Sequence, residues 1–296
     1  MKNIFLLLSI LLSINTFSQS EYFITSADQT KLHVREFGSG EPLIFLAGGP
    51  GLNADYLEAI WGKLSSDYRC IVLDQRGTGK SILPKVDSVS LTMENYVSDL
   101  EALRNHLKLE QITLIGHSWG GMLAMEYVSK KHKSVKNLIL LNPGGPTSNF
   151  FSYFSDNIQM RLHAEDTREA KVLDSLGKSD LRAIFPGYFF DRDRALALKE
   201  IWDFDSIFGQ PGVMGNTFSN FISTQKDRVS HLKNYTGIVH IIQGRQDPIG
   251  ESTVYEIKEL LPQSQVTFIE KCGHFPWLEN GDQVAEFFKV LHSALN

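Results

Sequence analysis

A serine between two glycines is the first group in this chain whose type and spacing indicate chemistry. Ser118 lies in the pentapeptide Gly116-His117-Ser118-Trp119-Gly120, after the apolar run 112–115 and before a helical pattern. In that context Gly-x-Ser-x-Gly is typical of a nucleophile elbow, a sharp strand-to-helix turn that exposes one hydroxyl above a sheet. Small flanking residues let nearby backbone pass without a steric clash. We therefore expect Ser118 to be a nucleophile.

A serine hydroxyl needs a base to remove its proton and a third group to orient that base. Asp247 follows the apolar run 238–242, and His274 follows the run 266–269. Taken singly, an Asp before proline or a Gly-His pair usually belongs to a surface turn. Three such residues after three predicted strands, in the order serine, acid, histidine, instead predict a catalytic triad.

Other acids and histidines fit this chemistry less well. Asp227 and Glu270 are the weaker alternatives for the acid, because the first lies at the edge of a predicted helical lobe and the second still lies on a strand. His117 is expected to shape the elbow rather than to react. We predict neither a metal nor an organic cofactor, because the other histidines lack metal-ligand spacing: His33, His106, His132, His163, His231, His240 and His292.

The oxyanion of an acyl-transfer reaction needs two preorganised N–H donors. Trp119 follows the nucleophile and is expected to supply one of them, while the loop after the third strand supplies the other. That loop reads Ala47-Gly48-Gly49-Pro50-Gly51, and the N–H of Gly49 is the candidate. A flexible turn is the alternative interpretation of this glycine run.

The elements that would position these groups alternate between strands and helices. Residues 21–25 and 31–37 predict an antiparallel hairpin, and continuous apolar runs typical of buried parallel strands follow. These runs are 43–46, 70–73, 112–115, 138–141, 238–242 and 266–269. Helical patterns lie between them, with Thr92 as an N-cap and with Asn280 and Gln283 as a capping box. The alternation predicts an α/β fold with helices on both faces of a sheet.

One long stretch interrupts this alternation. Residues 144–231 contain no clear strand pattern and are rich in aromatic side chains, which predicts a helical cap inserted between the sixth and seventh strands. Most of these aromatic residues are expected to form the core of the cap, and a few to line a cleft. The predicted core then consists of residues 21–143 and 232–296.

Residues 1–20 are predicted to be a signal peptide. Lys2 precedes an almost wholly apolar run over residues 4–14, which is too short to span a bilayer, and small or polar residues follow it. We expect cleavage after Ser18 or Ser20, export to a periplasm or out of the cell, and no membrane span afterwards. An N-terminal helix packed on the domain is the alternative.

Composition limits the partners. A chain of 296 residues with 42 % hydrophobic residues can form one large core with an inserted lobe. A net charge of −5 argues against nucleic acid or an anionic membrane as the main partner. Cys70 and Cys272 are expected to be free, buried thiols, because their strands would not be neighbours.

Four segments together resemble the proline iminopeptidase family of α/β-hydrolases, across residues 40–143 and 237–290. They are Gly48-Gly49-Pro50-Gly51, Asp74-Gln75-Arg76-Gly77-Thr78-Gly79-Lys80-Ser81, Gly116-His117-Ser118-Trp119-Gly120-Gly121 and Gly273-His274-Phe275-Pro276-Trp277-Leu278-Glu279. The resemblance implies the α/β-hydrolase fold, with a mostly parallel eight-stranded sheet, helices on both faces and an inserted helical cap. It also implies a serine peptidase.

The chain departs from the family pattern in two places. Ala47 stands where the family usually has histidine, which leaves the backbone donor intact. Family aminopeptidases hold the α-ammonium of the substrate with acidic residues of the cap, and no motif identifies these residues here. The candidates for substrate binding are Glu200, Asp203 and Asp205, together with Trp202 between them.

These observations predict a serine hydrolase that cleaves an amide or ester through an acyl-enzyme. The favoured activity is release of an N-terminal residue, such as proline, from a short peptide. A carboxylesterase or lactonase acting on a small apolar acyl group is the alternative, and a non-catalytic binding protein of the same fold is a third. Epoxide hydrolases and dehalogenases are disfavoured, because they place Asp where this chain has Ser118. Oligomeric state is left open.

Overall fold

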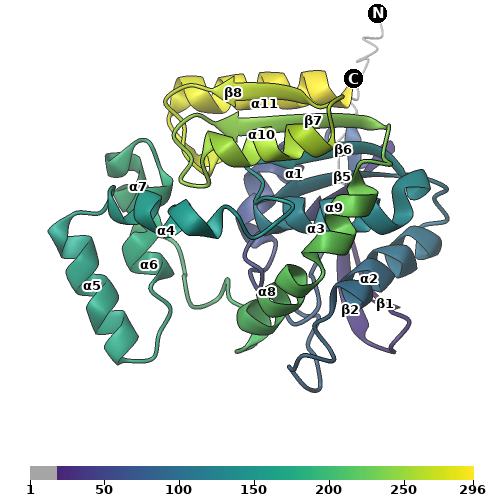
Figure 1. Cartoon of the computed structure of the whole chain (residues 1–296), viewed down its shortest axis with the longest axis horizontal. Coiled ribbons are helices and arrows are strands. Elements are labelled where there is room, and N and C mark those ends of the chain that lie inside the picture. Colours follow the sequence, from purple (N-terminus) through teal and green to yellow (C-terminus); the bar gives the residue numbers. More distant parts are fainter. Residues whose placement is uncertain (1–18) are drawn as a thin grey trace, which may run out of the picture.

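The predicted strands pair into one sheet of eight, which the computed structural model describes within residues 19–296 (Figure 1). The strand order is β1-β2-β4-β3-β5-β6-β7-β8. The first two pairings, β1 with β2 and β2 with β4, are antiparallel, and the others are parallel. The strands are β1 (Gln19–Thr25), β2 (Lys31–Phe37), β3 (Glu41–Leu46), β4 (Tyr68–Leu73), β5 (Ile112–His117), β6 (Val135–Leu141), β7 (Ile238–Gly244) and β8 (Gln265–Ile269).

Both faces of the central strands are buried, as their continuous apolar sequences predict. Along β3, Ile44 and Leu46 belong to the core on one face, while Leu43 and Phe45 belong to the core on the other. Every residue of β5 is buried. Parallel strands end at the same edge of the sheet, so the loops after β3, β5, β7 and β8 can meet there.

Helices cover both faces, which confirms the predicted fold class. The helices α2 (Met93–His106), α3 (Trp119–Lys131) and α10 (Glu251–Leu260) bury apolar side chains in one core. The helices α1 (Glu58–Leu64) and α11 (Gly281–Leu295) do so in the other. Three short 3₁₀ helices complete this part: η1 (Asp55–Leu57), η2 (His132–Ser134) and η4 (Pro276–Leu278).

One of the two predicted helix caps is present. The side chain of Thr92 accepts a hydrogen bond from the N–H of Asn95 at 3.2 Å, as predicted. The prediction of a capping box at Asn280 and Gln283 is wrong, because the Asn280 side chain makes no cap hydrogen bond. Its amide instead donates to the carboxylate of Asp191 in the helical insertion.

The insertion between β6 and β7 is helical, and its parts pack differently. In Figure 1 α4 to α7 lie to the left of the sheet, whereas α9 lies in front of it beside α3 and α8 lies below α9. Phe221 and Leu232 join the core next to α3. The predicted boundaries of the cap at 144 and 231 stay a prediction. Its helices are α4 (Phe151–Gln159), α5 (Ala164–Ser175), α6 (Leu181–Ile184), η3 (Phe185–Tyr188), α7 (Arg192–Lys199), α8 (Val213–Ser223) and α9 (Gln225–Leu232).

The predicted signal peptide lies almost wholly outside the described residues. Gln19 and Ser20 are exceptions, since they open β1 and pair with Phe37 and Glu36. A boundary after residue 20 would therefore fall inside a strand. Between residues 19 and 296, no helix has the length and apolar character needed to cross a bilayer.

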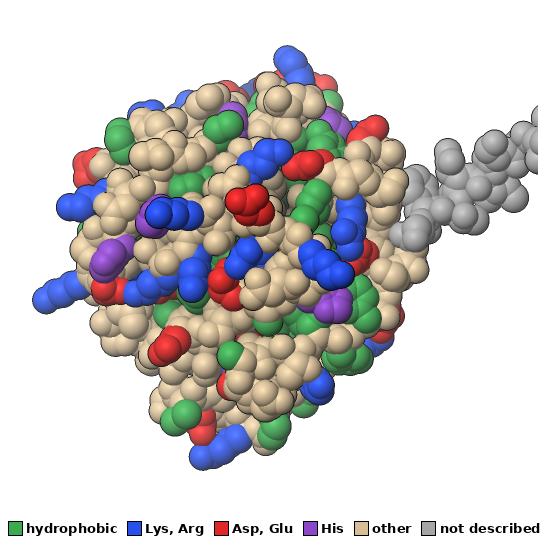
Figure 2. Space-filling view, turned by 90° about the vertical axis from the view of Figure 1, so that its right-hand side faces the viewer, with side chains coloured by type: hydrophobic (Ala, Val, Ile, Leu, Met, Phe, Trp, Pro, Cys, Tyr) green, Lys and Arg blue, Asp and Glu red, His purple; other side chains and the backbone are tan. Residues whose placement is uncertain are grey.

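Charged side chains of both signs are mixed over the face seen in Figure 2, which is the right-hand side of Figure 1. Lysine and arginine lie beside aspartate and glutamate there, so charge on this face is compensated locally. The two cysteines, Cys70 and Cys272, are free and buried, as predicted.

Candidate active site

Ser118 occupies a strained turn between β5 and α3. Its backbone has φ 54° and ψ −118°, a conformation that residues with a side chain rarely adopt. Two glycines make the turn possible. A Cβ on Gly116 would lie 2.4 Å from the carbonyl oxygen of Gly120, and one on Gly120 would lie 2.1 Å from that of Leu46. The elbow therefore needs glycine at both flanking positions.

Asp247 and His274 are brought together at the ends of β7 and β8. Asp247 Oδ2 lies 2.9 Å from His274 Nδ1, and both side chains are buried. A carboxylate only accepts, so Nδ1 carries the proton of this hydrogen bond and Nε2 of the neutral ring is free to accept. The main-chain N–H of His274 donates to the carbonyl of Tyr188 at 2.7 Å, which fixes the loop against the helical insertion.

Asp247 is held by two further donors. The amide of Asn142 donates to Oδ2 at 2.6 Å, and the N–H of Ile249 donates to Oδ1 at 2.8 Å. Asn142 follows β6 directly and has a positive φ of 45°. Three donors therefore supply hydrogen bonds to this one buried carboxylate.

Glu279 links the loop that carries His274 to the helical insertion. Its carboxylate accepts from the N–H groups of Gly273 and Phe190, each at 2.8 Å, and of Asp191 at 3.3 Å. Burial raises the pKa of Glu279, and these N–H donors oppose that rise. The loop is therefore tied to the insertion by backbone contacts rather than left free.

The loop after β3 lies against the elbow through Gln75. The Gln75 amide donates to the carbonyl of Ala47 at 2.8 Å and accepts from the indole N–H of Trp119 at 2.9 Å. The Gly48 N–H is already used, since it donates to Tyr56 Oη at 2.6 Å. Among the described residues, the main-chain N–H groups of Gly49 and Trp119 donate to no protein acceptor. Both predicted oxyanion donors are thus available.

A cavity of about 310 Å³ lies over these groups, and Ser118 and His274 both line it. Most of its wall is aromatic or aliphatic. Asp180 is the single acidic side chain among its described lining residues, and Tyr188 lies on the same wall. Burial, then the nearby Asp180 and Asp247 carboxylates, raise the pKa of Tyr188, so its phenol stays protonated.

The structure does not bring the three acids predicted for substrate binding to this cavity. Trp202 does line it, with its ring 4.9 Å from that of Phe185. Its charged neighbours stay at the surface, where their carboxylates remain hydrated. Glu200 lies 3.4 Å from Arg182, Asp205 lies 3.8 Å from Lys178, and Asp203 accepts from the N–H groups of Asp205 and Ser206.

The alternative acids also lie elsewhere. Asp227 pairs with Lys130 and lies 3.2 Å from His231, while Glu270 pairs with Arg245 at 3.0 Å. Neither contacts His274. Asp247 is therefore the one of the three candidates in contact with the histidine.

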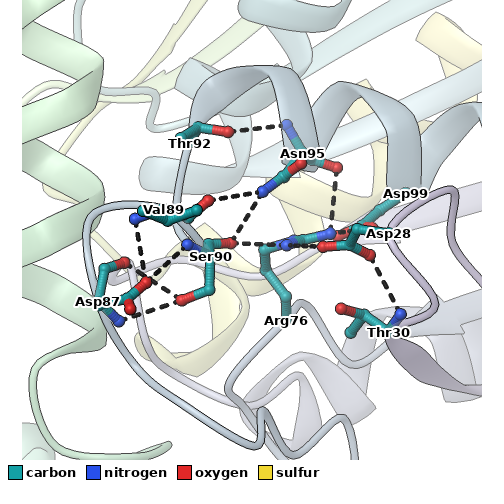
Figure 3. Close-up of polar contacts among 9 residues, drawn as sticks. All are labelled: Asp28, Thr30, Arg76, Asp87, Val89, Ser90, Thr92, Asn95 and Asp99. Carbon is teal, nitrogen blue, oxygen red and sulfur yellow. Dashed lines mark hydrogen bonds and ion pairs between the residues drawn. The ribbon is translucent and has the colours of Figure 1, made fainter.

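Arg76, which follows Gln75, is the centre of a buried polar network (Figure 3). Its guanidinium donates to both oxygens of Asp99 at 2.7 and 2.6 Å, to Asp28 at 3.0 Å and to the carbonyl of Ser90 at 2.6 Å. These contacts join the β1–β2 turn, the loop before α2 and α2 itself. The network fixes the segment from which Gln75 reaches the elbow.

Sequence reasoning missed Asn142, Tyr56, Gln75 and Asp180. Asn142 could have been found, because it is a polar residue directly after a buried strand. Asp247 likewise follows a buried strand within a few residues. Gln75 lies in a motif noted only as a family feature. Tyr56 and Asp180 carry no local signal, since both are defined by contacts with distant segments.

Comparison with known proteins agrees with this fold. Residues 41–281 match the family model described as alpha/beta hydrolase fold. A proline iminopeptidase of Heyndrickxia coagulans is 28 % identical over 280 residues, covering 88 % of this chain and 92 % of that protein. A cis-3-alkyl-4-alkyloxetan-2-one decarboxylase of Shewanella oneidensis is 37 % identical over 120 residues, but this match spans only 40 % of this chain and 37 % of the relative.

Solved structures share the fold at low identity. A proline iminopeptidase of Mycobacterium smegmatis superposes with a TM-score of 0.69 at 22 % identity, covering 93 % of this chain and 98 % of that one. An esterase of Exiguobacterium antarcticum superposes with a TM-score of 0.68 at 24 % identity, covering 92 % of this chain and 97 % of that one. The predicted similarity to proline iminopeptidases is confirmed, and the family match covers most of the sequence. This chain belongs to the α/β hydrolase family.

Proposed function

We propose that the protein is a serine hydrolase that cleaves an amide or ester through an acyl-enzyme. The observation that carries this proposal is the hydrogen bond between Asp247 and His274, in a loop whose histidine lines the same cavity as Ser118. A binding protein would not need a strained serine and an oriented imidazole in the lining of one cavity.

The proposed reaction uses side chains and main-chain N–H groups of this chain. Ser118 Oγ attacks the substrate carbonyl while His274 Nε2 takes its proton and later gives it to the leaving group. Asp247 holds the imidazole in the required tautomer. The N–H groups of Gly49 and Trp119 stabilise the oxyanion, and water then releases the acyl group from Ser118.

Replacing the nucleophile tests this reaction. Ser118→Ala is expected to lower kcat by several orders of magnitude with an unchanged circular dichroism spectrum. Ser129→Ala is the matched control, because Ser129 lies on the same helix, is buried and bonds only a local carbonyl. Equal activity of Ser118→Ala and the control would reject the proposal.

The favoured substrate is a short peptide with a free N-terminal residue such as proline. Similarity to proline iminopeptidases supports it, and so does the cavity, which the exposed residue Asp180 lines together with aromatic residues. A carboxylate and aromatic faces together attract a substrate ammonium. Asp180 replaces Glu200, Asp203 and Asp205 as the proposed partner of that group.

A carboxylesterase or lactonase is the second candidate, because the rest of the cavity wall is largely apolar and suits a neutral acyl group. The two are separated by comparing prolyl-naphthylamide with short acyl esters in wild type and in Asp180→Asn. The peptidase proposal predicts that Asp180→Asn raises KM for the amide at least tenfold and leaves ester hydrolysis unchanged. Preference of the wild type for esters by kcat/KM would favour the second candidate.

A further inference from the structure

His117 and Tyr56 connect three loops that carry the proposed catalytic groups. Tyr56 Oη lies 2.7 Å from His117 Nδ1 and 2.6 Å from the N–H of Gly48. His117 Nε2 lies 3.0 Å from the main-chain carbonyl of His274. The contacts run from the loop after β3, through the elbow, to the loop after β8. We call these contacts, made by Gly48, Tyr56, His117 and His274, the Tyr56–His117 bridge.

Donor and acceptor roles in the bridge follow from its chemistry. The His274 carbonyl can only accept, so His117 carries its proton on Nε2 and presents a lone pair at Nδ1. Tyr56 must then donate its hydroxyl proton to Nδ1, and its oxygen accepts from the Gly48 N–H. Burial and the neighbouring His274 lower the pKa of His117 well below its usual value, so the ring stays neutral. Every group in the bridge is satisfied in this arrangement.

The side chains and main chain around the bridge are closely packed. A Cβ on Gly48 would lie 2.9 Å from Tyr56 Oη, 3.2 Å from Ser118 Cβ and 3.3 Å from His117 Nδ1. The His117 ring also contacts the ring of His274, with centroids 4.6 Å apart, and that of Trp277 at 4.8 Å. The bridge is therefore closely packed beside Ser118.

The bridge has a direct consequence for the oxyanion site. Because Tyr56 occupies the Gly48 N–H, that group cannot serve the oxyanion, and the peptide group before the Gly48–Gly49 peptide is held in place. The Gly49 N–H is left as the donor from this loop. The main chain at His274 is set by the same contacts, so donor and base are positioned relative to Ser118 together.

We propose that Tyr56 and His117 are positioning residues that align the Gly49 donor and His274 with Ser118. This inference rests on the proposed hydrolase function. Neither side chain reacts, and each acts through the main chain of a neighbouring loop. The orientation they set matters most in the transition state, when negative charge develops on the substrate oxygen.

Removal of one hydroxyl tests the inference kinetically. Tyr56→Phe should lower kcat on the best ester or amide by about 10- to 100-fold, somewhat less than complete loss of an oxyanion donor, with KM changed less than threefold. Tyr235→Phe is the matched control, because it deletes a buried phenol hydroxyl that contacts only the carbonyls of Lys136 and Ile238. His117→Gln, which keeps an N–H donor for the His274 carbonyl, should retain more activity than His117→Phe.

A spectroscopic measurement separates this inference from the proposed function. In ¹⁵N-labelled wild type, the inference predicts that His117 is neutral with its proton on Nε2, and that the Gly48 amide proton resonance shifts in Tyr56→Phe. A proton on Nδ1, or an unshifted Gly48 amide, overturns it whether or not the protein is an enzyme. Wild-type kcat in Tyr56→Phe also overturns it. Failure of Ser118→Ala to lose activity instead rejects the proposed function.

Discussion

Asp247 and His274 meet through a buried 2.9 Å hydrogen bond between Oδ2 and Nδ1, and Asn142 donates to the same oxygen at 2.6 Å. Both carboxylate oxygens thus accept hydrogen bonds, since the Ile249 N–H donates to Oδ1. A group that can only accept is required at this position. This requirement makes the identity of the acid a sensitive test of the site.

Asp247→Asn should lower kcat about 10⁴-fold, as expected when the imidazole of a triad loses its correct tautomer. The introduced amide nitrogen must face either the Ile249 N–H or the protonated His274 Nδ1, which sets donor against donor. Steady-state kinetics on the preferred substrate measure the loss. Asn142→Ala keeps the carboxylate and removes the amide that donates to Asp247 and, at 3.1 Å, to the carbonyl of Gly273, so its kcat should fall only about tenfold. Equal losses in the two variants would show that Asp247 does not select the tautomer.

Gln75 offers a second kinetic prediction, because one side chain holds both the oxyanion loop and the residue after the nucleophile. Gln75→Leu removes the bonds to the Ala47 carbonyl and the Trp119 indole and leaves both buried groups unpaired. We expect kcat to fall at least tenfold, and the free energy of unfolding to fall by about 1–3 kcal/mol. Kinetics and urea denaturation check the two effects. A wild-type kcat in Gln75→Leu would show that Gln75 does not set the orientation of the oxyanion loop.

Much of this architecture could be predicted from sequence because strand burial and turn chemistry are local. All eight strands were predicted, and so were the elbow geometry around Ser118 and the pairing of Asp247 with His274. Sequence alone could not place Asp180 in the cavity, because its position depends on how the helical insertion folds over the sheet. Glu200, Asp203 and Asp205 are close to Trp202 in sequence, but they do not line the cavity. Only the tryptophan turns inward, since isolated carboxylates stay hydrated.

The buried ion pair between α3 and α9 predicts a stability effect. Arg228 Nε lies 3.0 Å from Glu126 Oε2, and burial lowers the pKa of Arg228 to about 10. Arg228→Met leaves the Glu126 charge buried without a partner and should cost about 3–5 kcal/mol of unfolding free energy. Combining it with Glu126→Gln should recover most of that loss. Urea denaturation of the single and double variants measures these changes in unfolding free energy. A loss below about 1 kcal/mol in Arg228→Met would contradict a buried ion pair between Arg228 and Glu126.

His117 predicts a pH dependence of stability with a defined sign. Its pKa is lowered in the folded protein, so below about pH 6.5 the unfolded chain binds a proton that the folded chain does not. The associated stability is complete above the unfolded pKa and is lost as pH falls through that value towards the folded pKa. We expect the fall in Tm between pH 7 and pH 5 to be smaller in His117→Gln than in wild type.

The control for this pH effect is His240→Gln. Burial also lowers the pKa of His240, but its side chain is only partly buried. Its replacement should reduce the pH dependence less than that of His117. Identical Tm profiles for wild type and His117→Gln would contradict a neutral, buried His117.

Covalent labelling of Ser118 tests the central claim most directly. A fluorophosphonate reacts with a serine only where a base activates the hydroxyl and donors stabilise the oxyanion, so it reports the assembled site without knowledge of the natural substrate. The account predicts one adduct per chain, mapped by peptide mass spectrometry to Ser118, absent from Ser118→Ala and slowed at least 100-fold in His274→Ala. An unlabelled wild-type protein, or an adduct at another residue, would contradict it and favour a non-catalytic binding role.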